Sequence, residues 1–162
     1  MLARLWREEN GSTSHARMQV WLADGKLLAL ASHYPAARAA LIEADDAKHI
    51  ARLDACDTQL SPREASLAWL FPHIPAHAWY LRTLAVAGQA RGQGAGSQVL
   101  QNIARSAHSQ GATELHTDVD SGNPGAVRFY QHHGFEIIAE TRVPILEPFN
   151  LPASYRMVKK LA

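Results

Sequence analysis

The chain lacks several features that mark whole classes of protein. Cys56 is the only cysteine in 162 residues, so an internal disulfide is excluded and a cytoplasmic location is expected. The net charge is +1 without a polybasic stripe or a run of like charges, which disfavours nucleic acid as a partner. The apolar stretches are too short to cross a bilayer, and residues 1–9 lack the apolar core of a signal peptide, so no membrane role is expected.

The histidines do not form a metal-binding pattern. His132 and His133 are adjacent, so their side chains diverge on a helix, and Pro75 between His73 and His77 prevents a helical i, i+4 pair. We therefore expect no metal site. The chain length fits a single domain, residues 1–162, with enough residues to bury a core.

The order of the expected elements predicts an α+β fold. Residues 18–23 and 26–32 flank Asp24-Gly25, the signal of a tight β-hairpin. A helical insertion over residues 36–77 follows, and within it Ser61-Pro62-Arg63-Glu64 predicts the capped start of a second, short helix. Strands are expected at 79–86, 113–120, 135–143 and 155–161, with a proline-rich connection over 144–152. The pattern indicates a mixed, mostly antiparallel sheet with helices on its faces.

A glycine-rich loop is the first motif with chemical meaning. Residues 91–97 read Arg-Gly-Gln-Gly-Ala-Gly-Ser between the strand expected at 79–86 and an amphipathic helix. That helix places Val99, Leu100, Ile103, Ala104 and Ala107 on one face and ends near Gly111. Unobstructed backbone N–H groups at a helix N-terminus suit a diphosphate, although a plain strand-to-helix turn uses glycine as well.

A second motif follows about thirty residues later. It reads Asn-Pro-Gly-Ala-Val-Arg-Phe-Tyr-Gln-His-His-Gly-Phe over residues 123–135, with Pro124 near the start of a helix and Gly134 at its end. Together the two motifs resemble the GNAT superfamily of acyl-CoA-dependent N-acyltransferases. Arg91, Gly94 and Gly96 match the family's loop, Arg/Gln-x-x-Gly-x-Gly/Ala. Its second signature is matched by Asn123, Ala126, Phe129, Tyr130, Gly134 and Phe135.

The resemblance implies a central sheet with splayed strands, helices on both faces and acetyl-CoA as co-substrate. It is firm from about residue 80 to residue 139 and weak before Leu81. The family usually opens with a strand and a helix for which the residues before the hairpin leave no room, so the first strand and helix are expected to be lacking. The chain is either naturally short, or its recorded start lies downstream of the true one. The first hairpin strand would then be an exposed sheet edge, which a second copy could cover in a homodimer.

The resemblance also implies which residues hold the cofactor. The backbone of residues 91–97 would bind the diphosphate, with a direct charge from Arg91. Replacing Gly96 by a bulky residue is expected to weaken cofactor binding and to leave the fold largely intact. The splayed strand would pair with the pantetheine arm and supply the oxyanion donor. Asn123 is an N-cap with an added contact to the arm. The full set is Leu84, Ala85, Val86, Arg91, Gly92, Gln93, Gly94, Ala95, Gly96, Ser97, Asn123, Ala126 and Tyr130.

Tyr130 is the predicted catalytic residue. Its phenol would donate a proton to the leaving thiolate, whereas a tyrosine on an apolar helix face is otherwise usually part of a core. The general base stays open, because Tyr80 stands where some family members carry a glutamate. The candidates, for each of which an exposed polar residue without a catalytic role is the favoured interpretation, are His73, His77, Glu114, His116, Asp118 and Asp120.

Two functions of different class fit these motifs. The first is an N-acetyltransferase acting on a primary amine of a small molecule or peptide, and the second is a non-catalytic acyl-CoA-binding module. A larger acyl group or an alcohol acceptor is a third, weaker possibility. Trp69, Phe71, Trp79, Ile145, Leu146 and Phe149 are candidate walls of the acceptor pocket, and core packing explains most of them equally well.

Overall fold

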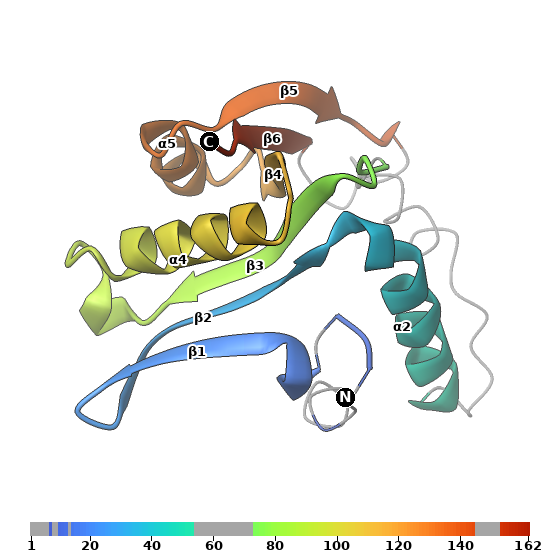
Figure 1. Ribbon diagram of the computed structural model, residues 1–162, viewed down its shortest axis with the longest axis horizontal. Helices are drawn as coiled ribbons and strands as arrows, with labels where there is room; N and C mark the ends of the chain where they lie inside the picture. The colour runs from blue at the N-terminus through green and yellow to red at the C-terminus, as the bar shows by residue number, and fades with distance from the viewer. Residues whose placement is uncertain (1–6, 8–9, 13, 54–72, 145–152) are drawn as a thin grey trace.

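The computed structural model describes residues 7, 10–12, 14–53, 73–144 and 153–162, which form an open six-stranded sheet with helices on both faces (Figure 1). The strand order is β1-β2-β3-β4-β6-β5, and every neighbouring pair is antiparallel except β3 and β4. The strands are β1 (Met18–Ala23), β2 (Lys26–Pro35), β3 (Ala78–Val86), β4 (Glu114–Asp120), β5 (Glu136–Thr141) and β6 (Ser154–Lys160). The α-helices are α2 (Ala39–Leu53), α4 (Ala95–Ser109) and α5 (Pro124–His132), with 3-10 turns η1 (His15–Arg17), η2 (Ala36–Arg38) and η4 (Gly88–Ala90).

The hairpin between β1 and β2 forms at the predicted turn. Asp24 and Gly25 both have positive φ angles, 50° and 71°, as a two-residue hairpin turn with matching twist requires. Ala23 pairs with Lys26 directly across the turn. Strand β2 continues past the expected end at Ser32 to Pro35, because its last residues pair with the start of β3.

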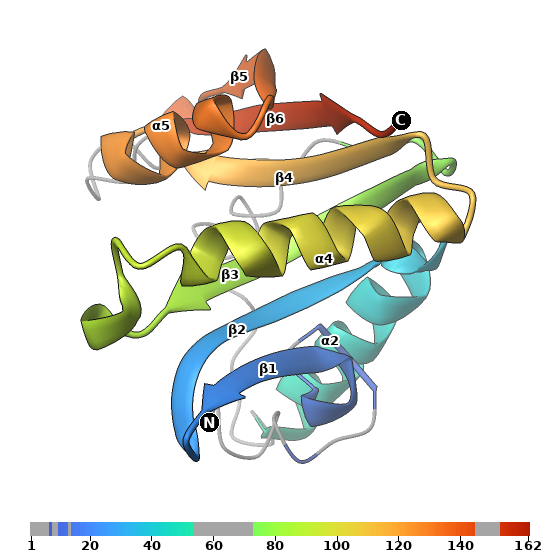
Figure 2. The ribbon, with the colours of Figure 1, turned by 60° about the vertical axis from the view of Figure 1, so that its left-hand side comes forward.

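The main core lies between the sheet and α4, on a side that we call the α4 face. Of the five α4 residues predicted to share an apolar face, Val99, Leu100, Ile103 and Ala107 are buried and Ala104 is partly buried. They pack on a layer of strand residues that includes Ala29, Ala31, Leu81, Leu115 and Met157. Figure 2 shows α4 crossing in front of the sheet, with α5 on the same side.

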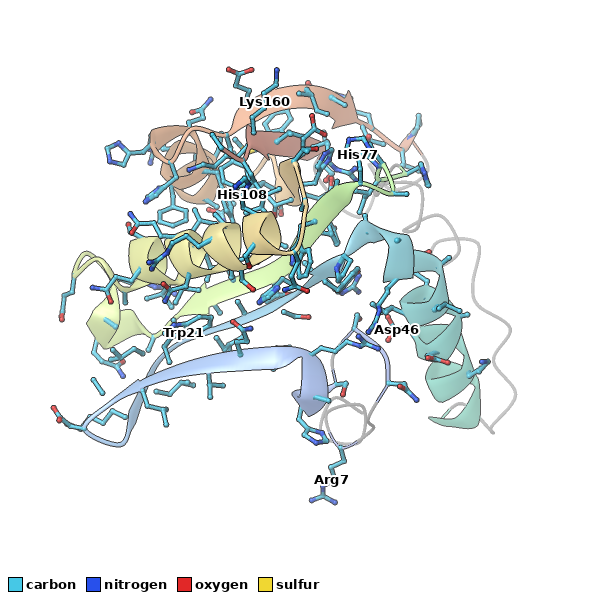
Figure 3. The ribbon with its side chains drawn as sticks, viewed as in Figure 1. Arg7, Trp21, Asp46, His77, His108 and Lys160 are labelled. Carbon is cyan, nitrogen blue, oxygen red and sulfur yellow. The ribbon has the colours of Figure 1, made fainter. Side chains whose placement is uncertain are left out.

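The opposite side, the α2 face, has a smaller core. Tyr34, Ile42 and Tyr80 are buried together, with Ala39 and Ile74 packed against them. A carboxylate oxygen of Asp46 on α2 accepts a 2.8 Å hydrogen bond from the backbone N–H of Ser12, and Figure 3 shows Asp46 near the N-terminal segment. Residues 36–53 of the expected insertion form η2 and α2, whereas Cys56 and the capping box at residues 61–64 lie outside the described residues.

Strands β3 and β4 form a fork rather than a continuous ladder. They pair only from Ala78–Leu81 to Glu114–Thr117, while β4 pairs with β6 along its whole length. A β-bulge at Arg82 interrupts the β2–β3 register, since Ser32 pairs with Thr83 and His33 with Leu81. A bulge bends its strand, and its extra residue shifts by one position the alternation of side chains between the two faces of the sheet. Trp79 and Leu81 therefore face α4 before the bulge, and Leu84 and Val86 do so after it.

In the part of the chain that the structure describes, the sheet ends in two edge strands, β1 on one side and β5 on the other. Val20 and Leu22 on β1, and Leu27 on β2, are exposed large hydrophobic residues. Among the described residues, no helix is long and apolar enough to cross a membrane.

Candidate active site

The glycine loop connects the open end of β3 to the start of α4. Gly92 and Gly94 have φ angles of 73° and 82°, in the left-handed region that other residues avoid, and Gly94 is the N-cap of α4. The side chains of the loop support its own turn, because the Arg91 Nε donates to the Val86 carbonyl at 3.3 Å and the Gln93 amide donates to the Gln89 carbonyl at 2.7 Å. The loop therefore takes a defined shape in which its glycines are required by backbone geometry.

The first turn of α4 presents backbone donors. The Gln98 N–H donates to the Gly94 carbonyl at 3.0 Å, which is the first bond of the helical ladder. The N–H groups of Ala95, Gly96 and Ser97 precede that bond, so they have no carbonyl partner within the helix. They lie at the positive end of the helix dipole, where an anion is stabilised.

Gly96 has a packing role in addition to the one expected. A Cβ at this position would lie 3.2 Å from Val86 Cγ2 and 3.4 Å from Phe129 Cε2, so the missing side chain allows α4 to pack against β3 and α5. The expectation that a bulky residue here would leave the fold largely intact is corrected, because the added atoms would press on neighbouring protein groups.

The unpaired half of β3 exposes main-chain groups toward the fork. The Ala87 N–H donates to the Leu28 carbonyl at 2.8 Å, which extends the β2–β3 ladder beyond the pair of Ala29 with Val86. Antiparallel pairs alternate between hydrogen-bonded and non-hydrogen-bonded, so the polar backbone groups of Leu84 and Val86 point away from β2. They point to the side on which β4 has already diverged.

Tyr130 lies at the vertex of the fork. Its hydroxyl lies near the side chain of Thr117, which belongs to the last residue pair between β3 and β4. The ring is buried among aromatic neighbours, 5.2 Å from the rings of both Phe129 and Phe135 between centroids. Burial raises the pKa of Tyr130 to about 12, and the nearby Thr117 side chain partly opposes this shift. The phenol is therefore protonated at neutral pH.

Asn123 acts as the N-cap of α5. Its side-chain oxygen accepts a 3.0 Å hydrogen bond from the Ala126 N–H, and Pro124 occupies the first turn as predicted. The side-chain NH₂ group is not used by this cap.

The α2 face of the fork carries a buried ion pair that the sequence did not reveal. Arg156 on β6 donates to both carboxylate oxygens of Asp118, at 2.7 and 2.8 Å, and the two side chains are 3% and 2% exposed. The Tyr80 hydroxyl donates to the same carboxylate at 2.8 Å. Tyr80 occupies the position of the absent glutamate, and its hydroxyl instead orients Asp118.

His116 and Glu114 lie on the same face, just before the fork. His116 Nε2 is 3.0 Å from Glu114 Oε2, and because a carboxylate only accepts, Nε2 carries the hydrogen. His116 Nδ1 is buried without a hydrogen-bond partner. Burial lowers the pKa of His116, and the hydrogen bond from His116 lowers the pKa of Glu114. The imidazole is therefore neutral, with an open lone pair on Nδ1.

The other base candidates are placed differently. Asp120 is exposed and accepts from the Gly122 N–H at 2.6 Å, which fixes the turn after β4. His77 contacts Glu114 at 3.5 Å with a side chain that is 61% exposed, and Figure 3 shows it beside the start of β3, away from the glycine loop. His73 contributes its carbonyl, which accepts from Arg156 at 3.4 Å. Within the described residues, no cluster of three or more His, Cys, Asp or Glu residues forms a metal site.

A second unexpected contact joins α5 to the first turn of α4. The His133 Nε2 lies 2.9 Å from the Ser97 hydroxyl, and His133 Nδ1 lies 2.8 Å from the Phe129 carbonyl. Sequence reasoning assigned Ser97 to the cofactor and treated His133 only as a rejected metal ligand. A histidine one residue before the helix-ending Gly134 was the available signal, but its partner is 36 residues away.

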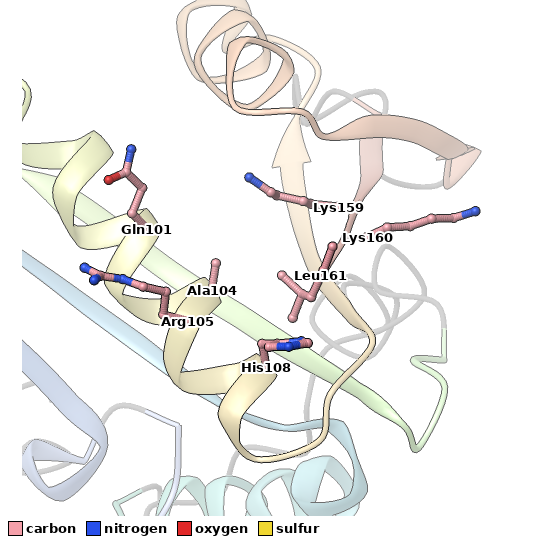
Figure 4. Close-up of a pocket in the computed structure, with 8 residues that line it drawn as sticks. Gln101, Ala104, Arg105, His108, Lys159, Lys160 and Leu161 are labelled. Atoms are coloured by element: carbon pink, nitrogen blue, oxygen red, sulfur yellow. The ribbon is translucent and has the colours of Figure 1, made fainter.

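An open pocket of about 480 Å³ lies at the other end of α4, against the last residues of the chain (Figure 4). It is lined by Gln101, Ala104, Arg105, His108, Lys159, Lys160, Leu161 and Ala162. Figure 4 shows the Lys160 side chain pointing away from α4. The pocket contains neither the glycine loop nor Tyr130, so it lies apart from the fork.

The fork, the glycine loop and the capped second helix together define the architecture that the resemblance implies for acyl-CoA-dependent acyltransferases. A model of the acetyltransferase (GNAT) family matches residues 2–135, and the chain belongs to this family. The family resemblance and the mixed α+β fold expected from the sequence are thereby confirmed.

Solved structures of the same fold support this assignment. The chain resembles an acetyltransferase (TM-score 0.66, 23% identity, 94% of this chain and 74% of that chain). It also resembles an N-acetyltransferase from Staphylococcus aureus Mu50, with a TM-score of 0.65 and 13% identity over 92% of this chain and 73% of that chain. A third similar structure is the ribosomal-protein-S18-alanine N-acetyltransferase from Escherichia coli, with a TM-score of 0.56 and 14% identity over 90% of this chain and 70% of that chain. A comparison with curated proteins finds no match.

Proposed function

We propose that this chain is an N-acetyltransferase that transfers the acetyl group of acetyl-CoA to a primary amine by direct attack. The observation that supports the proposal most strongly is the fork, where β3 separates from β4, the glycine-capped start of α4 follows β3 in the chain, and Tyr130 lies near Thr117 of the last residue pair. These three features supply the groups that acyl transfer from a thioester needs.

Each part of the fork has one task. The free N–H groups of residues 95–97 bind the diphosphate of the co-substrate, with the Arg91 side chain at the loop. The backbone groups of Leu84 and the N–H of Val86 pair with the amide groups of the pantetheine arm, as an added strand would, whereas the Val86 carbonyl already accepts from Arg91. An N–H of residues 84–86 then faces the thioester oxygen and stabilises the negative charge that develops there.

Tyr130 completes the reaction as general acid. The acceptor nitrogen bonds to the carbonyl carbon, the carbon–sulfur bond breaks, and the phenol proton passes to the departing sulfur. The raised pKa keeps Tyr130 protonated at neutral pH, so the phenol can donate as the thiolate develops, after which the phenolate regains a proton from solvent. Protonated tyrosine at the vertex is therefore the form that the reaction requires.

The acceptor amine also has to lose a proton. On the α2 face, Asp118 is engaged by both Arg156 and Tyr80, so its oxygens are occupied. His116 is neutral and its Nδ1 has no partner, while Glu114 links its Nε2 side to the surface. We assign the amine proton to His116 Nδ1. The proton would reach this buried nitrogen through a water molecule or after the acceptor displaces the groups that bury it. Direct loss of the proton to solvent is the competing route.

The acceptor belongs to the amines of small molecules or peptides. Two of the similar structures are a ribosomal-protein-S18-alanine N-acetyltransferase and a ribosomal-protein-alanine N-acetyltransferase from Brucella melitensis (TM-score 0.54, 17% identity), whose acceptors are proteins. The α2 face at the fork carries both charged and aromatic groups, Asp118, Arg156 and Tyr80 among them. These three side chains are buried and paired with one another, so the peptide acceptor is supported by the two similar structures and not by these groups.

One experiment separates the proposed enzyme from a non-catalytic acyl-CoA-binding module. Acetyl-CoA is mixed with a panel of peptides and small amines, and free thiol is followed with time alongside calorimetric titration of CoA. Amine-dependent thiol release supports the enzyme. Binding of CoA without thiol release for any amine favours the binding module, and folded protein that binds no CoA removes both.

The exposed edge strand β1 supports a homodimer as the assembled form. A sheet edge with unpaired backbone and exposed Val20 and Leu22 is a surface that a second copy of β1 can cover. Light scattering across micromolar concentrations tests this, and a monomeric mass throughout argues against it.

A further inference from the structure

Two side chains connect the helices that border the diphosphate site. Ser97 belongs to the first turn of α4, and His133 is the residue that ends α5. The serine hydroxyl and His133 Nε2 are 2.9 Å apart, and both residues are partly buried. The imidazole is held in place by the Phe129 ring, whose centroid is 4.5 Å away, and by the Phe129 carbonyl.

The hydrogen bonds determine which nitrogen carries a hydrogen. The Phe129 carbonyl at 2.8 Å can only accept, so His133 Nδ1 donates to it. In the neutral imidazole, Nε2 is then an acceptor. The Ser97 hydroxyl must donate to Nε2, which turns its proton away from the helix N-terminus and leaves only lone pairs for other partners.

Protonation of His133 reverses that direction. With a hydrogen on both nitrogens, Nε2 donates to the serine oxygen and the Ser97 hydroxyl is released to donate elsewhere. The free N–H groups of residues 95–97 point to the same region, where a diphosphate is expected. A diphosphate accepts hydrogen bonds only, so it favours the state in which Ser97 is a donor.

We propose that His133 is a positioning residue that couples diphosphate binding to uptake of one proton. The proton comes from solvent, bonds to His133 Nε2, and frees the Ser97 O–H for a phosphate oxygen. The inference rests on the proposed function, because it takes the first turn of α4 as the diphosphate site. It adds a pH dependence of co-substrate affinity that the family assignment does not contain.

The charged neighbours of His133 come from two other positions. Lys159 on β6 donates to the His133 carbonyl at 2.8 Å, and His132 is adjacent on α5 with its ring centroid 5.4 Å away. A bound diphosphate would bring negative charge beside the imidazole and would favour the form with a hydrogen on both nitrogens. Histidine is the side chain that ordinarily titrates near physiological pH, so the exchange is available there.

The experiment is calorimetric titration of CoA in two buffers of different ionisation enthalpy, from about pH 6.5 to about pH 8. The variant His133→Gln keeps an N–H donor near Nε2 but cannot titrate, and His132→Gln is the matched control. Protons taken up by CoA itself are common to all forms, so the difference between forms is the readout. S-acetylpantetheine, which lacks the diphosphate, should show no difference.

We expect wild type and His132→Gln to take up more protons than His133→Gln, by up to about one per CoA. Their affinity should fall about tenfold more across the pH range than that of His133→Gln. Ser97→Ala should also lose the extra uptake, and it serves as the second variant if His133→Gln does not fold. Equal proton counts and pH profiles in forms that all bind CoA overturn the inference and leave the proposed function standing. No CoA binding by folded wild type overturns the proposed function.

Discussion

The two faces of the sheet at the fork are built in opposite ways. On the α4 face, the groups with functional potential are main-chain ones, from Leu84, Val86 and the first turn of α4, and they have no partners within their own ladder or helix. On the α2 face they are side chains, and Asp118, Arg156 and Tyr80 are paired with one another in the protein interior.

This difference matches the two kinds of ligand in the proposed reaction: a co-substrate that is the same throughout a family, and an acceptor that differs among its members. Backbone donors do not depend on side-chain identity, so the α4 face suits a co-substrate common to a whole family. Side chains differ between chains, so the α2 face suits the acceptor. Tyr130 and Thr117 lie on the α4 face, and His116 lies on the α2 face. Thr117 belongs to the last residue pair between β3 and β4, and His116 is the residue before it.

The largest effect is expected for Tyr130→Phe. Removing the hydroxyl takes away the proposed proton donor and keeps the packed ring, so turnover should fall by about 100-fold or more. CoA affinity should stay within about twofold, since the α4-face backbone is unchanged. Steady-state kinetics and calorimetry measure the two quantities. Tyr34→Phe, on the α2 face, is the control, and unchanged turnover in Tyr130→Phe would remove the general-acid role.

The paired character of the α2 face is tested by Arg156→Met. It leaves the Asp118 carboxylate buried without its cation, which should lower the free energy of unfolding by about 3–5 kcal/mol. Urea denaturation followed by circular dichroism measures the change. The matched control is Arg142→Met, because the Arg142–Glu140 pair is exposed, with side chains 68% and 38% accessible, and such pairs contribute about 0–1 kcal/mol. A similar loss in both variants would contradict the role assigned to burial.

Two glycines on the α4 face test whether packing or ligand approach sets their identity. Gly96→Val adds atoms against Val86 and Phe129 and should lower the free energy of unfolding by about 1–3 kcal/mol, with weaker CoA binding as a consequence. In Gly125→Ala the new Cβ has its nearest neighbour 3.6 Å away, at the Asn123 side-chain oxygen, so the helix should gain up to about 1 kcal/mol. Thermal denaturation with and without CoA distinguishes these effects. A Gly96→Val protein of unchanged stability would return Gly96 to the role of clearing space for the ligand.

The contrast between the faces also explains what the sequence could predict. The hairpin at Asp24-Gly25, the apolar face of α4 and the capped start of α5 follow from local rules of turn, periodicity and capping, and all were correct. The bulge at Arg82 and the Asp118–Arg156 pair were missed, because they depend on strands that meet only in the folded sheet. The packing contact of Gly96 was missed as well, because its neighbours are a β3 residue and an α5 residue. Local patterns therefore predicted the elements of the α4 face better than the side-chain pairs of the α2 face.

The smallest effect is expected at Asn123, whose side-chain oxygen caps α5 and leaves the NH₂ group for contact with the co-substrate. Asn123→Ala removes the acceptor for the Ala126 N–H and should cost about 1 kcal/mol of unfolding free energy. Asn123→Asp keeps that acceptor and loses only the NH₂ donor, so its stability should stay close to wild type. If the NH₂ group contacts the pantetheine arm, CoA should bind Asn123→Asp several-fold more weakly, as one lost hydrogen bond predicts. Wild-type affinity in Asn123→Asp would reduce the residue to a helix cap, and the pantetheine contacts would then come from the backbone of β3 alone.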